Sequence, residues 1–157
     1  MKITDYNSLQ AVKEQGLKKY LPNRVRIAVG MGTCGIGNGA DEVLAQFGRQ
    51  LKKKKLNAYL TKTGCFGFCA QEPLVNVHIP GKPLVIFNRV SLRDVSSIVS
   101  GIIKGKLPEK KALCKIEEWD HLTSEKISFG RGEPRIPLWN EVEFFKYQRR
   151  SFCAIAG

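Results

Sequence analysis

The sequence predicts a small α/β domain, and three kinds of pattern support this fold class. Residues 24–29 and 74–79 alternate or concentrate apolar side chains in the way that is typical of strands. Between them, residues 40–56 repeat apolar side chains at the helical period. Glycine-rich stretches separate these segments and supply the turns. The chain of 157 residues is long enough for one domain with an ordinary core and a tail.

The first half of the chain predicts a helix followed by a strand–helix–strand unit. Residues 8–20 carry apolar side chains at helical spacing, and Pro22 ends this short amphipathic helix. The strand at 24–29 then leads through a glycine-rich turn into the helix at 40–56. Residues 57–61 form the second predicted strand.

The second half predicts two strands and a closing helix. The strands at 74–79 and 84–87 flank a Pro-Gly-Lys-Pro turn, so we expect an antiparallel hairpin at one side of the sheet. Ser91 is expected to cap a helix over residues 92–103. The order is therefore a helix, then β-α-β, then β-β-α, which is the thioredoxin-like arrangement.

Cysteines dominate the candidate chemistry. Cys65 and Cys69 are four residues apart in the stretch T-G-C-F-G-F-C-A-Q-E-P, where Gly64 and Gly67 allow a tight curl. Cys34 lies in a second glycine-rich turn, G-M-G-T-C-G-I-G-N-G. This spacing predicts a metal or cluster loop and argues against a dithiol redox motif, which is one residue shorter. The odd total of five cysteines also argues against a disulfide framework.

Residues 29–40 and the stretch T-G-C-F-G-F-C-A-Q-E-P-L-V resemble the thioredoxin-like [2Fe-2S] ferredoxin domain. They are similar above all to the version fused at the N-terminus of the flavin (NADH-binding) subunit of bacterial NADH dehydrogenases and electron-bifurcating hydrogenases. The resemblance implies that Cys34, Cys65 and Cys69 are metal ligands of a [2Fe-2S] cluster. The leading cysteine of that family would fall at about Gly30, so the fourth ligand is open.

Other side chains are weaker candidates for the open ligand position. His78 stands alone in a predicted strand, where a histidine is more often a surface group than a ligand. Cys114, Cys153 and His121 lie in the tail and could reach the site only if the tail folds back. Phe66 and Phe68 flank the thiols and would provide apolar cover.

A rival interpretation uses the same glycines. Gly30, Gly32 and Gly35 spell G-x-G-x-x-G between a strand and a helix, which is the form of a dinucleotide-binding fingerprint. That fold places a carboxylate at the end of its second strand, whereas here that strand leads into Lys62. Glycines that let backbone amides approach cluster sulfur explain the turn better.

The tail changes character after residue 104. It is charged and proline-containing, so we expect residues 105–157 to be an extended connector after an N-terminal helix (1–23) and the ferredoxin-like domain (24–104). Residues 131–157 resemble the stretch that leads into the flavin domain of the fused subunits. Aromatic side chains there predict a contact surface for a partner, namely Trp139, Phe144, Phe145 and Tyr147.

The net charge, the apolar runs and the missing catalytic motifs limit the classes of function that the sequence allows. The formal charge of +12 is scattered and accompanies no nucleic-acid module, so we expect no nucleic-acid partner, and the run of lysines at 52–55 reads as a solvated helix end. No apolar run is long enough to span a bilayer and no signal-peptide core is present, which predicts a cytoplasmic chain. No catalytic triad, carboxylate pair or phosphate-binding loop is visible, so we predict no catalytic site of its own.

The resemblance therefore implies an electron-transfer domain or subunit of an NADH-dependent oxidoreductase. The resemblance implies as partners a flavin/NADH-binding domain or subunit and other iron-sulfur subunits. Two alternatives remain: a docking module of the same kind of complex in which the cluster is absent, and a dinucleotide-binding domain.

Overall fold

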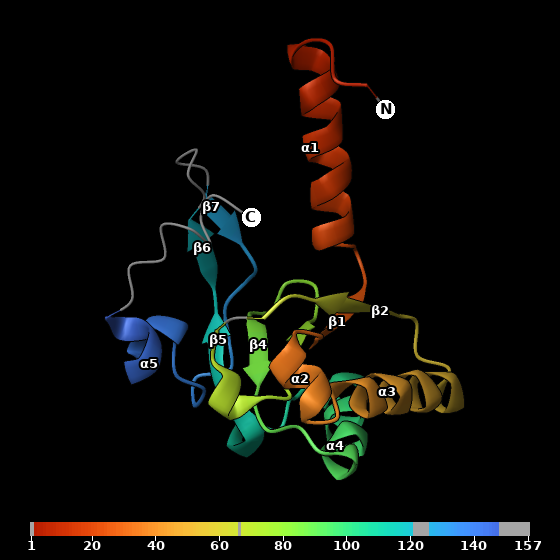
Figure 1. Cartoon of the computed structure of the whole chain (residues 1–157), viewed down its shortest axis with the longest axis vertical. Helices are drawn as coiled ribbons and strands as arrows, with labels where there is room; N and C mark the ends of the chain where they lie inside the picture. The colour runs from red at the N-terminus through yellow and green to blue at the C-terminus, as the bar shows by residue number, and fades with distance from the viewer. Residues whose placement is uncertain (1, 66, 121–125, 148–157) are drawn as a thin grey trace.

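A five-stranded sheet organises the chain in the computed structural model, which describes residues 2–65, 67–120 and 126–147 (Figure 1). The strand order is β2-β1-β3-β4-β5. Only the β1–β2 pair is parallel, and the other three pairs are antiparallel. The strands are β1 (Val25–Gly30), β2 (Ala58–Thr63), β3 (Val75–His78), β4 (Leu84–Phe87) and β5 (Ala112–Ile116).

Helices α3 and α4 cover one face of this sheet and form the main core with it (Figure 1). Alternate strand residues point to this face because side chains alternate across a strand. Val29, Val77 and Phe87 from the sheet are fully buried here, as is Phe47 of α3. The helices are α1 (Tyr6–Tyr20), α2 (Thr33–Gly37), α3 (Ala40–Lys54) and α4 (Leu92–Ile103).

The expected elements of the first 104 residues are confirmed within a few residues at each end. The strand predicted at 84–87 and the helix predicted at 92–103 coincide with β4 and α4. Ser91 does cap α4, in a capping box completed by Asp94. One correction concerns the first glycine-rich turn, which is not merely a turn: its middle forms the short helix α2.

The tail departs from the expected extended connector. The β3–β4 hairpin is antiparallel and lies at one side of the sheet, as predicted. Strand β5, which was not predicted, pairs with β4 and forms the edge of the sheet on that side. A second, two-stranded sheet follows, formed by β6 (Glu118–Asp120) and β7 (Lys126–Ser128). Regular structure therefore continues past residue 104, while the domain boundaries themselves stay a prediction.

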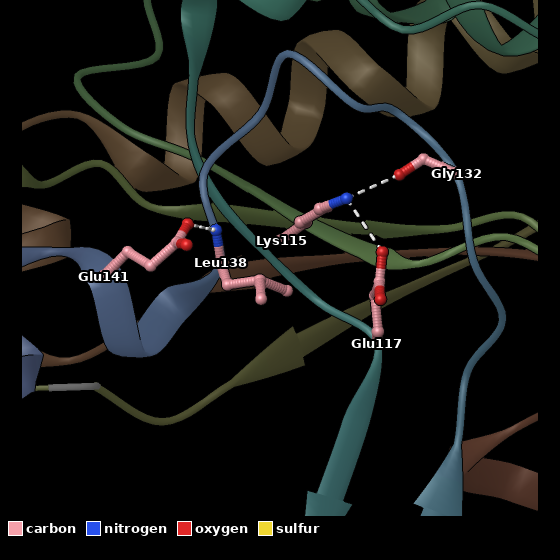
Figure 2. A network of polar contacts seen from close by, with 5 residues as sticks. All are labelled: Lys115, Glu117, Gly132, Leu138 and Glu141. Atoms are coloured by element: carbon pink, nitrogen blue, oxygen red, sulfur yellow. Dashed lines mark hydrogen bonds and ion pairs between the residues drawn. The ribbon is translucent and has the colours of Figure 1, made fainter.

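Polar contacts attach the later tail to β5 (Figure 2). The Lys115 ammonium donates to a Glu117 carboxylate oxygen at 2.7 Å and to the Gly132 carbonyl oxygen at 2.7 Å. Further along, the Leu138 amide donates to the Glu141 carboxylate at 2.7 Å. The Gly132 contact, the Lys115 amide that donates to the Pro137 carbonyl oxygen at 2.8 Å, and the bridge between Lys115 and Leu138 hold this segment against the edge strand. It leads into η3 (Trp139–Glu141) and α5 (Glu143–Lys146).

The second face of the sheet is covered by the tail itself. Leu74, Ile86 and Cys114 of this face pack with Phe129 and Phe145, which are each 4% exposed. Three of the four tail aromatics predicted to form a contact surface, Trp139, Phe144 and Phe145, therefore join the chain's own second core. Tyr147 alone of those four is strongly exposed, at 77%.

Helix α1 stands away from the sheet (Figure 1). A capping box of Asp5 and Ser8 starts it, and exposed apolar side chains such as Tyr6 and Leu9 lie along it. Among the described residues, no helix is both long and apolar enough to cross a bilayer.

Candidate metal centre

The three predicted ligands lie beyond one end of the strands, where β1 and β2 end and β3 begins. Because β1 and β2 are parallel, their last residues, Gly30 and Thr63, are partners in the ladder. Strand β3 runs the opposite way, so its first residue, Val75, starts at this end too, next to Val29. The connection that follows β1 and the connection that joins β2 to β3, residues 64–74, are therefore neighbours. These connections hold all three of the predicted thiol ligands.

Cys34 lies in α2, directly after β1, and glycines bring this helix close to its neighbours. An ideal Cβ built on Gly32 would lie 2.9 Å from the Cys65 Cβ, and one on Gly35 would lie 2.6 Å from the Gly30 carbonyl oxygen. Both contacts are shorter than a Cβ tolerates, so a larger residue at position 32 would push α2 away from the Cys65 loop, and one at position 35 would push it away from the end of β1. The glycines that the dinucleotide interpretation assigned to a pyrophosphate thus serve the approach of α2 to the Cys65 loop.

The loop from Cys65 to Cys69 curls back on its own sulfur. Gly67 has a φ of +82°, which glycine adopts without strain, and its amide donates to the Cys65 sulfur at 3.2 Å. Burial raises the pKa of the Cys65 thiol above its ordinary value, the Gly67 amide works in the opposite direction, and the nearby Cys69 thiol raises it further. An amide that points at sulfur is the contact that favours a thiolate over a thiol.

Cys69 starts η1 (Cys69–Gln71) and interacts with both other thiols. Contact with the Cys34 thiol is the largest cause of the raised pKa of Cys69, and the contact with Cys65 acts in the opposite direction. All three cysteines are exposed. Within the described part of the chain, no group of three or more His, Cys, Asp or Glu side chains is arranged so that it could hold a metal ion. Cys69 thus forms one pair with Cys34 and a second pair with Cys65.

A carboxylate that the sequence analysis did not single out lies beside these thiols. Glu72 is only 5% exposed, and one of its oxygens is 3.6 Å from the Cys65 sulfur. Its other oxygen accepts from the Leu74 amide at 2.7 Å. The sequence signal for Glu72 was its place three residues after Cys69, but surface glutamates are so common that spacing alone does not mark one as buried.

The other candidates for the open ligand position lie elsewhere or outside the described residues. His78 ends β3 at the opposite end of the sheet, where its ring approaches the Phe129 carbonyl oxygen at 3.4 Å. Cys114 of β5 is fully buried in the second core. Cys153, His121 and Phe66 fall on residues that the structure does not describe.

Phe68, which flanks the thiols, packs against the tail, and the apolar cover of the thiols themselves stays a prediction. The Phe68 ring stacks on that of Phe144 at a centroid distance of 3.8 Å and meets Phe145 edge-on at 5.8 Å. Both partners come from α5 at the far end of the described chain. The thiol loop is therefore anchored to the second core through the residue next to Cys69.

Comparison with known proteins rests on solved structures, because no family model matches the chain. The structure of a thioredoxin-like [2Fe-2S] ferredoxin from Aquifex aeolicus superposes with a TM-score of 0.51 at 23% identity, over 59% of this chain and 93% of that one. A second structure, of the wild-type form of the thioredoxin-like [2Fe-2S] ferredoxin from Aquifex aeolicus, gives a TM-score of 0.52 at 24% identity, over 59% and 99%. These similarities confirm the predicted fold class: the chain has the thioredoxin-like ferredoxin fold.

Proposed function

We propose that the chain is an electron-transfer module that binds a [2Fe-2S] cluster through Cys34, Cys65 and Cys69. The observation that carries the proposal is the meeting of these thiols at one end of the sheet, where Cys69 interacts with both of the others. A [2Fe-2S] cluster, when bound, supplies one-electron transfer. The likeness in fold to proteins described as [2Fe-2S] ferredoxins supports the same proposal.

The donor set fits three of the four ligand positions of such a cluster in its chemistry, and its thiols interact in pairs through Cys69. Iron–sulfur clusters are held by thiolates, and these three thiols are exposed at one end of the sheet. Gly32 leaves open the space that a Cβ would fill between α2 and Cys65. The raised pKa values of Cys65 and Cys69 mean that iron must displace protons as it binds, which makes loading pH-dependent.

The surrounding residues then have distinct tasks. The Gly67 amide donates to the Cys65 sulfur at 3.2 Å, and hydrogen bonds to ligand sulfur help to set the reduction potential. The Phe68 ring, stacked on Phe144, keeps water from one side of the loop. The exposure of the three cysteines leaves the other side open to a redox partner.

We further propose that the partners are a flavin/NADH-binding domain or subunit and other iron-sulfur subunits, within an NADH dehydrogenase or hydrogenase-type complex in the cytoplasm. Support for this context is the resemblance of residues 24–103 to the fused ferredoxin domain and the looser resemblance of the tail. Co-purification of the tagged chain with a flavin-containing subunit from its own source would test it.

A second candidate is a docking module without a cluster. It is favoured by the finding that the described residues contain no ready-made group of three metal-binding side chains. Iron and acid-labile sulfide, measured on protein purified anaerobically, separate the two functions. We expect about two irons and two sulfides per chain and a reduced form that is paramagnetic. A chain that stays free of iron even after incubation with ferrous iron and sulfide would contradict the cluster proposal.

A further inference from the structure

The candidate site offers three thiols, whereas a [2Fe-2S] cluster takes four protein ligands. We propose that the Glu72 carboxylate is the fourth ligand. This inference rests on the proposed function and names a residue that the motif does not contain. It is argued from four features of Glu72: its distance from Cys65, the way it is held, the space it occupies and its charge.

The distance between Glu72 and Cys65 matches that between two ligands of one metal ion. A tetrahedral metal with a sulfur ligand at about 2.3 Å and an oxygen ligand at about 2.0 Å places these two atoms about 3.5 Å apart. The Glu72 oxygen lies 3.6 Å from the Cys65 sulfur. An iron ion could therefore bind both atoms with only a small local movement.

Glu72 is held so that one oxygen is committed and the other faces the thiols. The Leu74 amide donates to the first oxygen at 2.7 Å, and this contact fixes the direction of the carboxylate. The second oxygen is the one that meets Cys65. A ligand whose outer oxygen is already hydrogen-bonded is oriented before the metal arrives, as supporting contacts do for metal ligands in general.

The carboxylate also fills the place where the resemblance puts a fourth thiol. An ideal Cβ built on Gly30 would lie 3.2 Å and 3.4 Å from the two Glu72 oxygens. A cysteine at position 30 would therefore occupy the same space as this side chain. Gly30 has no side chain, and this leaves the space that the Glu72 carboxylate occupies.

The charge and the burial of Glu72 also support its assignment as a ligand. A carboxylate carries the same single negative charge as a thiolate, so three thiolates and Glu72 give the cluster the same total charge as four thiolates. A carboxylate that is 5% exposed is costly unless a cation or hydrogen bonds compensate it. Within the described residues, Glu72 forms no ion pair with Lys or Arg, and its two oxygens meet the Cys65 sulfur and the Leu74 amide.

The test uses the full chain and compares Glu72→Gln with the double variant Gly30→Cys/Glu72→Ala. The amide of Glu72→Gln still accepts from Leu74 but is a poor iron ligand, so we expect the cluster to be lost to a chelator at least about 10-fold faster. In the double variant the sulfur at position 30 enters the space that the Glu72 oxygens leave, so the cluster should be retained with its visible bands moved to longer wavelength, because sulfur is the softer donor. The electron paramagnetic resonance spectrum of its reduced form should change as well.

Glu133→Gln is the matched control, because the side chain of Glu133 is also only 8% exposed and its ion pair with Lys82 lies at the opposite end of β3. It should leave iron content and spectrum unchanged. A wild-type chain that holds the cluster, with Glu72→Gln equal to it in spectrum and chelator resistance, overturns the ligand assignment and leaves the proposed function intact. A wild-type chain that holds no iron overturns both.

If Glu72→Gln fails to fold, judged by circular dichroism of the metal-free protein, the double variant Gly30→Cys/Glu72→Ala decides alone. Visible and paramagnetic spectra that differ from those of the wild type support the assignment. Spectra identical to those of the wild type overturn it, since a cysteine that does not replace a ligand leaves the iron surroundings as they were.

Discussion

Cys69 joins the two halves of the candidate site. It follows Phe68, which is half-buried and stacks on the tail, and it interacts with the thiols of both Cys34 and Cys65. The other two thiols belong to loops that follow different strands. A change at Cys69 therefore affects every thiol pair that the structure records at this end of the sheet.

Cys69→Ala and Cys114→Ala should separate a ligand from a structural thiol. Cys114 is fully buried in the second core, so its truncation should lower the free energy of unfolding by about 1 kcal/mol and leave the iron content unchanged. Cys69 is exposed, so its truncation should abolish iron binding at little cost to the stability of the metal-free protein. Iron assays and urea unfolding of both metal-free variants test this, and equal iron loss in the two would contradict it.

Glu72 shows what residue-level reading of the sequence could and could not find. The thiols were predictable because cysteine is rare and their glycine-rich settings are unusual. Glu72 was not, because a glutamate in a loop carries no sign of burial until the strands that cover it are placed. Its position depends on the pairing of β1 with β3, which joins segments that are distant along the chain.

At the scale of elements, local patterns predicted those elements whose own side chains form the core. Strand β4 and helix α4 coincide with the prediction because their apolar periodicity is complete. Helix α2 was missed since three of its five residues are Thr33, Gly35 and Gly37, which favour turns in isolation. Strand β5 was missed because its sequence, A-L-C-K-I, is short and lies in a charged segment.

The start of α4 carries a pH-dependent contact. Burial disfavours ionisation of Asp94, but hydrogen bonds from Ser91 and Lys111 outweigh it and hold the pKa of Asp94 below its ordinary value of 3.8. Its stabilisation is therefore complete above that value and is lost as the pH falls through the lower, folded-state pKa. The ion pair with Lys111, at 2.9 Å, also ties α4 to the segment that enters β5.

Asp94→Asn should weaken the capping box by about 1 kcal/mol at neutral pH and flatten the acid side of the stability profile. Denaturant midpoints measured from pH 7 downwards give both effects. Asp41→Asn, which removes an exposed acidic residue from the first turn of α3, is the control. Parallel acid profiles for the wild type and Asp94→Asn would contradict the assignment.

At the scale of the whole molecule, the sheet is closed on both faces by different parts of the chain. Helices α3 and α4 cover one face, and η3, α5 and the segment around Phe129 cover the other. The tail is thus part of the folded unit. The sequence could not show this, because aromatic residues in a proline-containing segment are compatible with either an internal or an external partner.

Phe145→Ala should lower the free energy of unfolding by about 3–5 kcal/mol, because a ring that is 4% exposed would leave a cavity in the second core. Tyr147→Ala is the matched control two residues away, where 77% exposure predicts a change within about 0.5 kcal/mol. Thermal and urea unfolding measure both. Equal stability of the two variants would mean that the tail does not cover the sheet in solution.

The stack of Phe68 on Phe144 has a mechanical consequence. One ring belongs to the residue directly before Cys69, and the other to the last helix that the structure describes, so the stack joins the Cys69 loop to α5. Tension applied to the chain beyond α5 would reach the Cys69 loop through the contacts of the Phe68 ring with Phe144 and Phe145. A partner that binds the chain beyond α5 would therefore act mechanically on the loop that carries Cys69.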